Sequence, residues 1–179
     1  MSTMSSSPAR PLTIVSNRLL ARRAGTRVLG QWLPVVFWLI VIMLESTDMM
    51  SGQHTGSFLL PLLTRIFGRI DPASFDCLHH LLRKSGHFIG YGILSLLLFR
   101  ALRSTVTPRL VRVGLLSVAL TGVVASLDEW HQTFIPSRTG CVQDVVLDTT
   151  AGACVQLVLL GVLYVSRRRV ARSELASVN

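Results

Sequence analysis

Four long apolar runs limit what this chain can fold into. They cover approximately residues 28–44, 86–102, 110–127 and 142–165. A helix needs about 20 mostly apolar residues to cross a bilayer, with about 17 as the lower limit. Each run reaches that limit, and the whole chain is 50% hydrophobic and only 15% charged. We therefore predict an all-α integral membrane protein, built as a four-transmembrane-helix bundle.

The segments outside these runs are polar or mixed. Residues 1–27 are rich in serine and arginine and contain no acidic residue, which predicts a disordered basic tail. Residues 166–179 form a second basic tail. Between the first two runs, the apolar residues of "GSFLLPLLTRIFGRI" (56–70) recur at roughly helical spacing, which favours a helix in the membrane interface. A loop that covers the bundle is the alternative, and the transmembrane domain is predicted to span residues 28–165.

The distribution of basic residues predicts an orientation. With four spans, both tails and the connector between the second and third spans share one side. That side has 13 of the 18 lysine and arginine residues, and the other side has 5. Short cytoplasmic segments carry an excess of Lys and Arg, so we expect both termini in the cytoplasm. Topology therefore explains the net charge of +9, and we expect no nucleic-acid partner.

Ionisable residues gather on the opposite, extracytoplasmic side. All but one of the nine acidic residues and all five histidines lie on that side or at the outer ends of the spans. The second span opens with Lys84, His87 and Tyr91, whose spacing places them on one helical face. The fourth span opens with Asp144 and Asp148, which also share a face. Two spans thus present polar side chains to the same end of the bundle.

The third span contributes the stretch "DEWHQTFIPSR" (128–138) at that end. Asp128, His131 and Gln132 share a face if the helix continues through them, and Glu129 and Arg138 add two more charges. Ionisable groups near membrane spans cost roughly 2.5–3.5 kcal/mol each on insertion scales, so they usually face the bundle interior and form pairs. We predict that the three segments form one polar site.

The residue types leave three uses of this site open. In an enzyme, His87 is the best candidate acid or base, with Asp128 and Glu129 beside it. In a binding site, Lys84 and Arg138 suit a phosphate or a carboxylate. The same groups can instead form a structural network between helices. The candidates for ligand binding are Lys84, Tyr91, Gln132, Arg138, Asp144 and Asp148.

Metal binding has weaker support in the sequence. Plausible ligands are present, but no H-E-x-x-H or H-x-H spacing fixes two of them at once, so we predict no resident metal or cofactor. The plausible metal ligands are His87, Asp128, Glu129, His131, Asp144 and Asp148.

The three cysteines are predicted to differ in their surroundings. Cys154 lies inside an apolar run and is predicted to belong to the core. Cys77 and Cys141 face one compartment, which permits a disulfide if that compartment is oxidising.

Three ordered motifs resemble those of VanZ-like membrane proteins. Residues 84–91 match the element K-x-x-H-F-x-x-Y, and residues 128–138 match D-E-x-x-Q-x-F-x-P-x-R. Asp144, Asp148 and Gly152 resemble the closing D-x-x-x-D/N element with its small residue. The resemblance extends from about residue 80 to residue 165. It departs from the family pattern in two places, because Ser137 stands where glycine is frequent and Ala151 where glycine is usual.

The resemblance implies a bacterial cell-envelope protein in the inner (cytoplasmic) membrane. The family is named after an accessory protein of glycopeptide resistance that lowers susceptibility to teicoplanin. The expected partners are membrane lipid and a lipid-linked cell-wall precursor that binds at the extracytoplasmic polar site. An enzyme that acts on a lipid-linked substrate and a purely structural polar network are the alternatives.

Overall fold

The computed structural model describes residues 11–105 and 109–178 of the chain. Every regular element in these two segments is helical, and four of the helices are long and apolar enough to cross a membrane. The predicted all-α, four-span architecture is therefore confirmed. The elements are α1 (Pro11–Glu45), a short 3-10 helix η1 (Asp48–Met50), α2 (Gly52–Phe67), α3 (Pro72–Thr105), α4 (Leu110–Gln132) and α5 (Val142–Val178).

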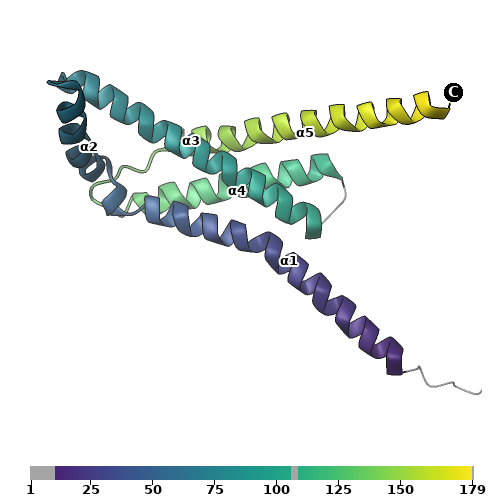
Figure 1. The fold of residues 1–179 in the computed structure, drawn as a ribbon. Coiled ribbons are helices and arrows are strands. Elements are labelled where there is room, and N and C mark those ends of the chain that lie inside the picture. Colours follow the sequence, from purple (N-terminus) through teal and green to yellow (C-terminus); the bar gives the residue numbers. More distant parts are fainter. Residues whose placement is uncertain (1–10, 106–108, 179) are drawn as a thin grey trace, which may run out of the picture.

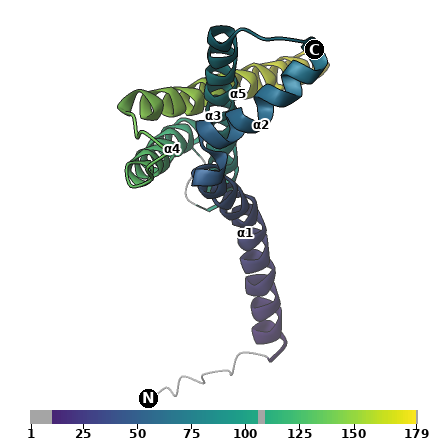
Figure 2. The ribbon, with the colours of Figure 1, turned by 90° about the vertical axis from the view of Figure 1, so that its left-hand side faces the viewer.

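Helix α3 is the centre of the bundle. It packs against α1, α4 and α5, and α4 and α5 also pack against each other. Figure 1 shows the α1–α2–α3 connections and the α4–α5 loop at one end of the bundle, with the last turn of α3 and the first turn of α4 at the other end. Toward its N-terminus, α1 diverges from the other long helices (Figures 1 and 2). The arrangement agrees with a four-span topology, while the side that faces the cytoplasm stays a prediction.

Small side chains let α3, α4 and α5 approach closely just below the polar site. A Cβ atom added at Gly152 of α5 would lie 3.1 Å from Thr121 Cγ2 of α4 and 3.3 Å from Ser95 Cβ of α3. The Ser95 hydroxyl donates to the Gly152 carbonyl over 3.2 Å, and Gln156 Nε2 donates to the Ser95 carbonyl over 2.9 Å. Close backbone approach and hydrogen bonding between helices are how membrane bundles are held together. This contact fixes the three helices beneath the site.

Two helices extend beyond the apolar runs. Residues 1–10 of the tail predicted to be disordered lie outside the described residues, and α1 includes residues 11–27. At the other terminus, α5 continues through the basic tail to Val178. Both segments contain Leu, Ala and Arg, which are good helix formers, and no proline interrupts them after the first residue of α1. A helix that leaves the membrane can therefore continue.

The predicted helix between the first two spans is present as α2. Its start is capped by Ser51, whose hydroxyl oxygen accepts from the His54 N–H over 3.4 Å. It ends at Phe67, and its C-cap residue Gly68 has a φ of 83°, a positive value that glycine adopts far more readily than other residues. Helix α3 begins soon afterwards at Pro72, and the Asp71 carboxylate caps it by accepting from the Ser74 N–H over 3.0 Å.

Candidate functional site

Two contacts join the polar faces of α3 and α5. Lys84 forms an ion pair with Asp144, and one helical turn deeper His87 Nδ1 lies 3.3 Å from Asp148 Oδ2. Lys84 and His87 lie three residues apart on one face of α3, and Asp144 and Asp148 lie four residues apart on one face of α5. The two faces therefore meet in register. Asp148 is completely buried, whereas Lys84 and Asp144 are half-buried at the end of the bundle.

A second set of contacts joins α3 to α4. The buried Tyr91 hydroxyl donates to Asp128 Oδ2 over 3.0 Å, and Gln132 Nε2 donates to the same oxygen over 3.1 Å. The contact from Gln132 requires α4 to continue through residue 132, as the shared face predicted. His131 does not join this group, because its Nδ1 lies 3.4 Å from the Ser46 hydroxyl at the end of α1.

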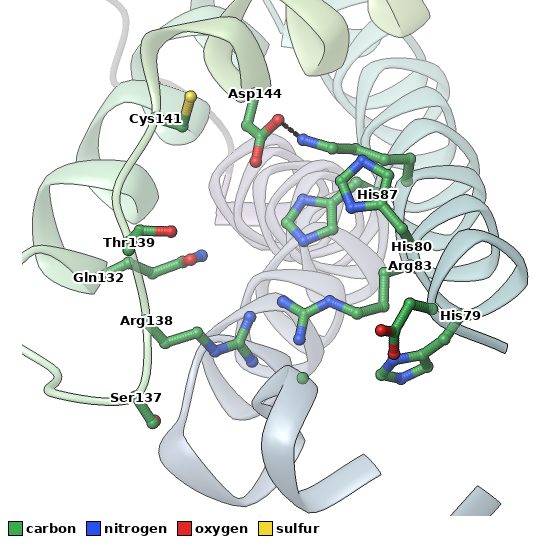
Figure 3. A pocket seen from close by; sticks show the side chains of 13 residues that line it. His79, His80, Arg83, His87, Gln132, Ser137, Arg138, Thr139, Cys141 and Asp144 are labelled. Carbon is green, nitrogen blue, oxygen red and sulfur yellow. Dashed lines mark hydrogen bonds and ion pairs between the residues drawn. The ribbon is translucent and has the colours of Figure 1, made fainter. Parts of the chain in front are cut away.

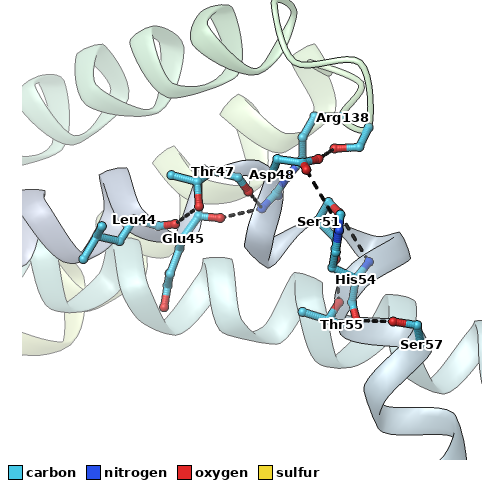
Figure 4. A network of polar contacts seen from close by, with 10 residues as sticks. Leu44, Glu45, Thr47, Asp48, Ser51, His54, Thr55, Ser57 and Arg138 are labelled. Carbon is cyan, nitrogen blue, oxygen red and sulfur yellow. Dashed lines mark hydrogen bonds and ion pairs between the residues drawn. The ribbon is translucent and has the colours of Figure 1, made fainter.

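Arg138 connects the α4–α5 loop to the end of α1. Its guanidinium donates through Nη2 to the backbone carbonyls of Glu45 and Thr47 (Figure 4). The neighbouring Ser137 hydroxyl donates to the Asp48 carboxylate. Burial lowers the pKa of Arg138, and the nearby positive charge of Arg83 lowers this pKa further. Among the described residues, no carboxylate forms an ion pair with Arg138, so its charge is balanced only by carbonyl dipoles and by more distant acids.

Glu129 lies beneath the turn that leads into α5. Its Oε2 atom accepts from the Cys141 N–H over 2.8 Å, whereas its buried Oε1 atom has no hydrogen-bond partner. A Cβ atom at Gly140 would lie only 2.4 Å from the Glu129 carbonyl oxygen and 2.6 Å from Thr133 Cγ2. The turn therefore needs a glycine here, since any side chain would push the Cys141 N–H away from the carboxylate.

A cavity of about 480 Å³ opens above these contacts. Figure 3 shows that Arg83 of α3 and Arg138 of the loop extend toward one another across it, with His80 and His87 nearby. Within the described part of the chain, no hydrogen bond or ion pair holds Arg83. The lining residues are Gly52, Asp76, His79, His80, Arg83, Lys84, His87, Gln132, Ser137, Arg138, Thr139, Cys141 and Asp144.

The nine predicted site residues divide into two groups. Five line the large cavity, and the other four form the polar contacts deeper between the helices. The cavity-lining group is Lys84, His87, Gln132, Arg138 and Asp144. The deeper group is Tyr91, Asp128, Glu129 and Asp148. The structure thus brings all three segments to one place, and the role of each residue stays a prediction.

Sequence reasoning missed three basic or histidine side chains in the cavity wall, namely His79, His80 and Arg83. A signal was present, because His80, Arg83 and His87 follow one another at intervals of three and four residues. The apolar run begins only at about residue 86, so the run alone does not indicate that the helix includes His79, His80 and Arg83. Helix α3 begins at Pro72 and carries these residues on its first turns.

The cysteines are unpaired. Cys77, Cys141 and Cys154 are free thiols in the structure. The prediction that Cys154 belongs to the core is wrong, since its side chain is exposed on the outer face of α5. An apolar run in a membrane helix has a lipid-facing side as well as a buried side, and the sequence does not separate the two.

Comparison with known proteins identifies the family. The family model described as VanZ/LLP1 matches residues 31–164, which reach into all four spans and include every residue of the polar contacts described above. The chain belongs to the VanZ family. It is accordingly a multi-pass membrane protein of VanZ-like type, and the predicted family membership is confirmed. No curated protein and no solved structure matches the chain.

Proposed function

We propose that this VanZ-like protein is a cell-envelope protein that binds the anionic headgroup of a lipid-linked precursor in the cavity above α3. The proposal places the cavity on the extracytoplasmic side of the bacterial inner membrane, with both termini in the cytoplasm. Occupation of the cavity by such a precursor is the route by which the protein would alter susceptibility to glycopeptides such as teicoplanin.

The observation that carries this proposal is the pair of guanidinium groups of Arg83 and Arg138. Two like charges that approach one another across a cavity repel, and an anion between them removes that repulsion. Arg138 is already fixed by carbonyl groups, so little conformational freedom remains to be lost when a ligand binds. Guanidinium groups also bind phosphate in a bidentate manner, which suits a phosphorylated headgroup.

The remaining lining supports the same ligand class. Lys84 is neutralised by Asp144 and so serves mainly to hold α3 against α5. His79 and His80 add neutral or positive hydrogen-bonding groups to the wall. The cavity volume lies within the range of about 300–1,000 Å³ that is typical of small-molecule sites. It lies at one end of a membrane bundle, where a lipid headgroup can reach it from the bilayer surface.

The proposal is tested by ligand binding to the purified protein in detergent, with a polyprenyl phosphate as the probe and the uncharged polyprenol for comparison. Arg83→Gln removes a charge-assisted hydrogen bond worth about 1.5–3 kcal/mol, so the affinity should fall about 10- to 100-fold. The matched control is Arg69→Gln, an exposed arginine between α2 and α3 that does not line the cavity. Equal binding of phosphate and alcohol, or equal losses in both variants, would refute the proposal.

A second candidate function is an enzyme that acts on the same class of substrate. It is favoured by the contact between His87, which lines the cavity, and the buried carboxylate of Asp148. A carboxylate that orients a histidine is the usual arrangement of a general base. His87→Gln should then abolish turnover of a bound polyprenyl-linked substrate while leaving its binding intact. Binding without any turnover in the wild-type protein would eliminate this candidate.

A further inference from the structure

Three side chains from three different helices converge behind the cavity. His87 of α3, Glu129 of α4 and Asp148 of α5 each offer one ligand atom, and these three atoms lie within 4.8 Å of one another. Hydrophobic packing between helices does not require such a meeting, since a buried carboxylate is costly unless it is paired. The convergence therefore needs a chemical explanation.

Two oxygen atoms of this cluster are buried and have no partner. They are Glu129 Oε1 and Asp148 Oδ1, in side chains that are 5% and 0% exposed. Each carboxylate uses only its other oxygen, in Glu129 for the Cys141 N–H and in Asp148 for His87. Unpaired buried carboxylate oxygens are rare in native proteins, and each one needs a physical explanation. A cation between them would satisfy both.

The nearby protein cations do not fill this role. Lys84 forms its ion pair with Asp144, and the Arg138 guanidinium donates to carbonyl groups at the end of α1. The deeper contacts also include Asp128, whose engaged oxygen Oδ2 accepts from the neutral donors of Tyr91 and Gln132. Among the described residues, no Lys or Arg forms an ion pair with Asp128, Glu129 or Asp148.

We propose that His87, Glu129 and Asp148 bind a divalent transition-metal ion, with Zn²⁺ as the best match. Imidazole nitrogen combined with carboxylate oxygen suits Zn²⁺, whereas Mg²⁺ and Ca²⁺ prefer ligand sets made of oxygen alone. Two carboxylates and a neutral imidazole cancel the charge of the ion, which lowers the cost of burying it among membrane helices. Zinc–ligand bonds of about 2.0 Å in a tetrahedron place ligand atoms about 3.3 Å apart, so only a small contraction of the cluster is needed.

The site departs from the expectation of no resident metal, which rested on the absence of two ligands close together in one segment. Here each ligand comes from a different helix, so no local motif marks the site. Three protein ligands leave a coordination position open, which is the arrangement of reactive rather than structural zinc sites. Because His87 also lines the cavity, that position has access to it. Metal binding itself does not depend on the proposed anion binding and is tested separately.

The test uses the full chain in detergent, stripped of metal with a chelator and titrated with Zn²⁺ by calorimetry. We expect one ion per chain for the wild-type protein. Glu129→Gln and Asp148→Asn should each weaken binding by about 100-fold or more, since even outer-shell changes cost 10- to 100-fold. Glu45→Gln is the matched control, because its exposed carboxylate lies at the same end of the bundle but outside the cluster.

Thermal unfolding and Co²⁺ spectra complete the test. Zn²⁺ should raise the unfolding temperature of the wild-type protein and of Glu45→Gln, but not that of Glu129→Gln. Without metal, Glu129→Gln should be at least as stable as the wild type, because it removes a buried charge and keeps an acceptor for the Cys141 N–H. If a variant fails to fold, intense visible bands of Co²⁺ bound to the wild type support the site. Absence of Zn²⁺ binding, or unchanged binding in a folded variant, overturns the proposal.

Discussion

Gly140 lies where the α4–α5 loop comes closest to the end of α4, and Gly140→Ala tests how tightly the loop is positioned. The added Cβ atom would lie 2.4 Å from the Glu129 carbonyl oxygen. That carbonyl cannot easily move, because it belongs to α4 and accepts from the Thr133 N–H over 3.3 Å. The loop must therefore shift away from the helix.

The shift has a calculable cost. Overpacking of this kind costs about 1–3 kcal/mol. The next residue, Cys141, donates its N–H to the Glu129 carboxylate, and a hydrogen bond to a charged group contributes about 1.5–3 kcal/mol. We expect Gly140→Ala to lower the free energy of unfolding by at least about 2 kcal/mol. Binding of the polyprenyl phosphate should weaken as well, since Arg138 lies two residues earlier in the same loop.

Gly161→Ala is the matched control for this experiment. Gly161 lies inside α5, and a Cβ atom there would meet nothing within 4 Å. The same substitution should therefore stabilise the protein by about 0.5–1 kcal/mol through higher helix propensity. Both variants are compared by unfolding in mixed micelles followed by circular dichroism. An unfolding free energy of Gly140→Ala at or above the wild-type value would show that the described loop geometry is incorrect.

Three further predictions concern the cavity wall, the deeper contacts and the topology. Gly52→Ala places a Cβ atom 2.7 Å from Arg83 Nη1, so it should displace this side chain and weaken binding of the phosphate probe while the unfolding temperature stays unchanged. Tyr91→Phe removes a hydroxyl donor to a carboxylate and should cost about 1.5–3 kcal/mol of stability, measured by thermal unfolding. On a cysteine-free background, Ser137→Cys should react with an impermeant thiol reagent in intact cells and Thr105→Cys should not; the reverse pattern would invert the orientation.

The membrane architecture and the location of the polar site could be predicted from the sequence. Apolar length fixes which segments cross the bilayer, and helical spacing places Lys84, His87 and Tyr91 on one face. The partners of these residues could not be predicted, since the order of spans does not determine which faces meet. From the sequence alone, Lys84 could pair with Asp128 or with Asp144. The packing of α3 on α5 selects Asp144.

The limits of α3 do not follow from its apolar run alone. A hydropathy window locates the part of a helix that lies in lipid and not the whole helix. The cap at Asp71 and the proline at position 72 mark the true start of α3, but these signals are weaker than the apolar run. Arg83 precedes that run, so hydropathy alone does not place it on the helix. The unpaired oxygens of Glu129 and Asp148 have no sequence signal, because they result from three helices meeting in space.

The bonds from Arg138 to carbonyl groups have an evolutionary and practical consequence. Arg138 recognises the backbone at Glu45 and Thr47, and every residue type presents the same carbonyl oxygen. The side chains at positions 45 and 47 can therefore vary without weakening the hydrogen bonds from Arg138. Substitutions at these two positions should not correlate with substitutions at position 138. A span that replaced α1 would still have to keep its packing against α3, including the bond from Trp38 Nε1 to the Gly90 carbonyl, whereas its last turn would need only to present carbonyl groups in the same place.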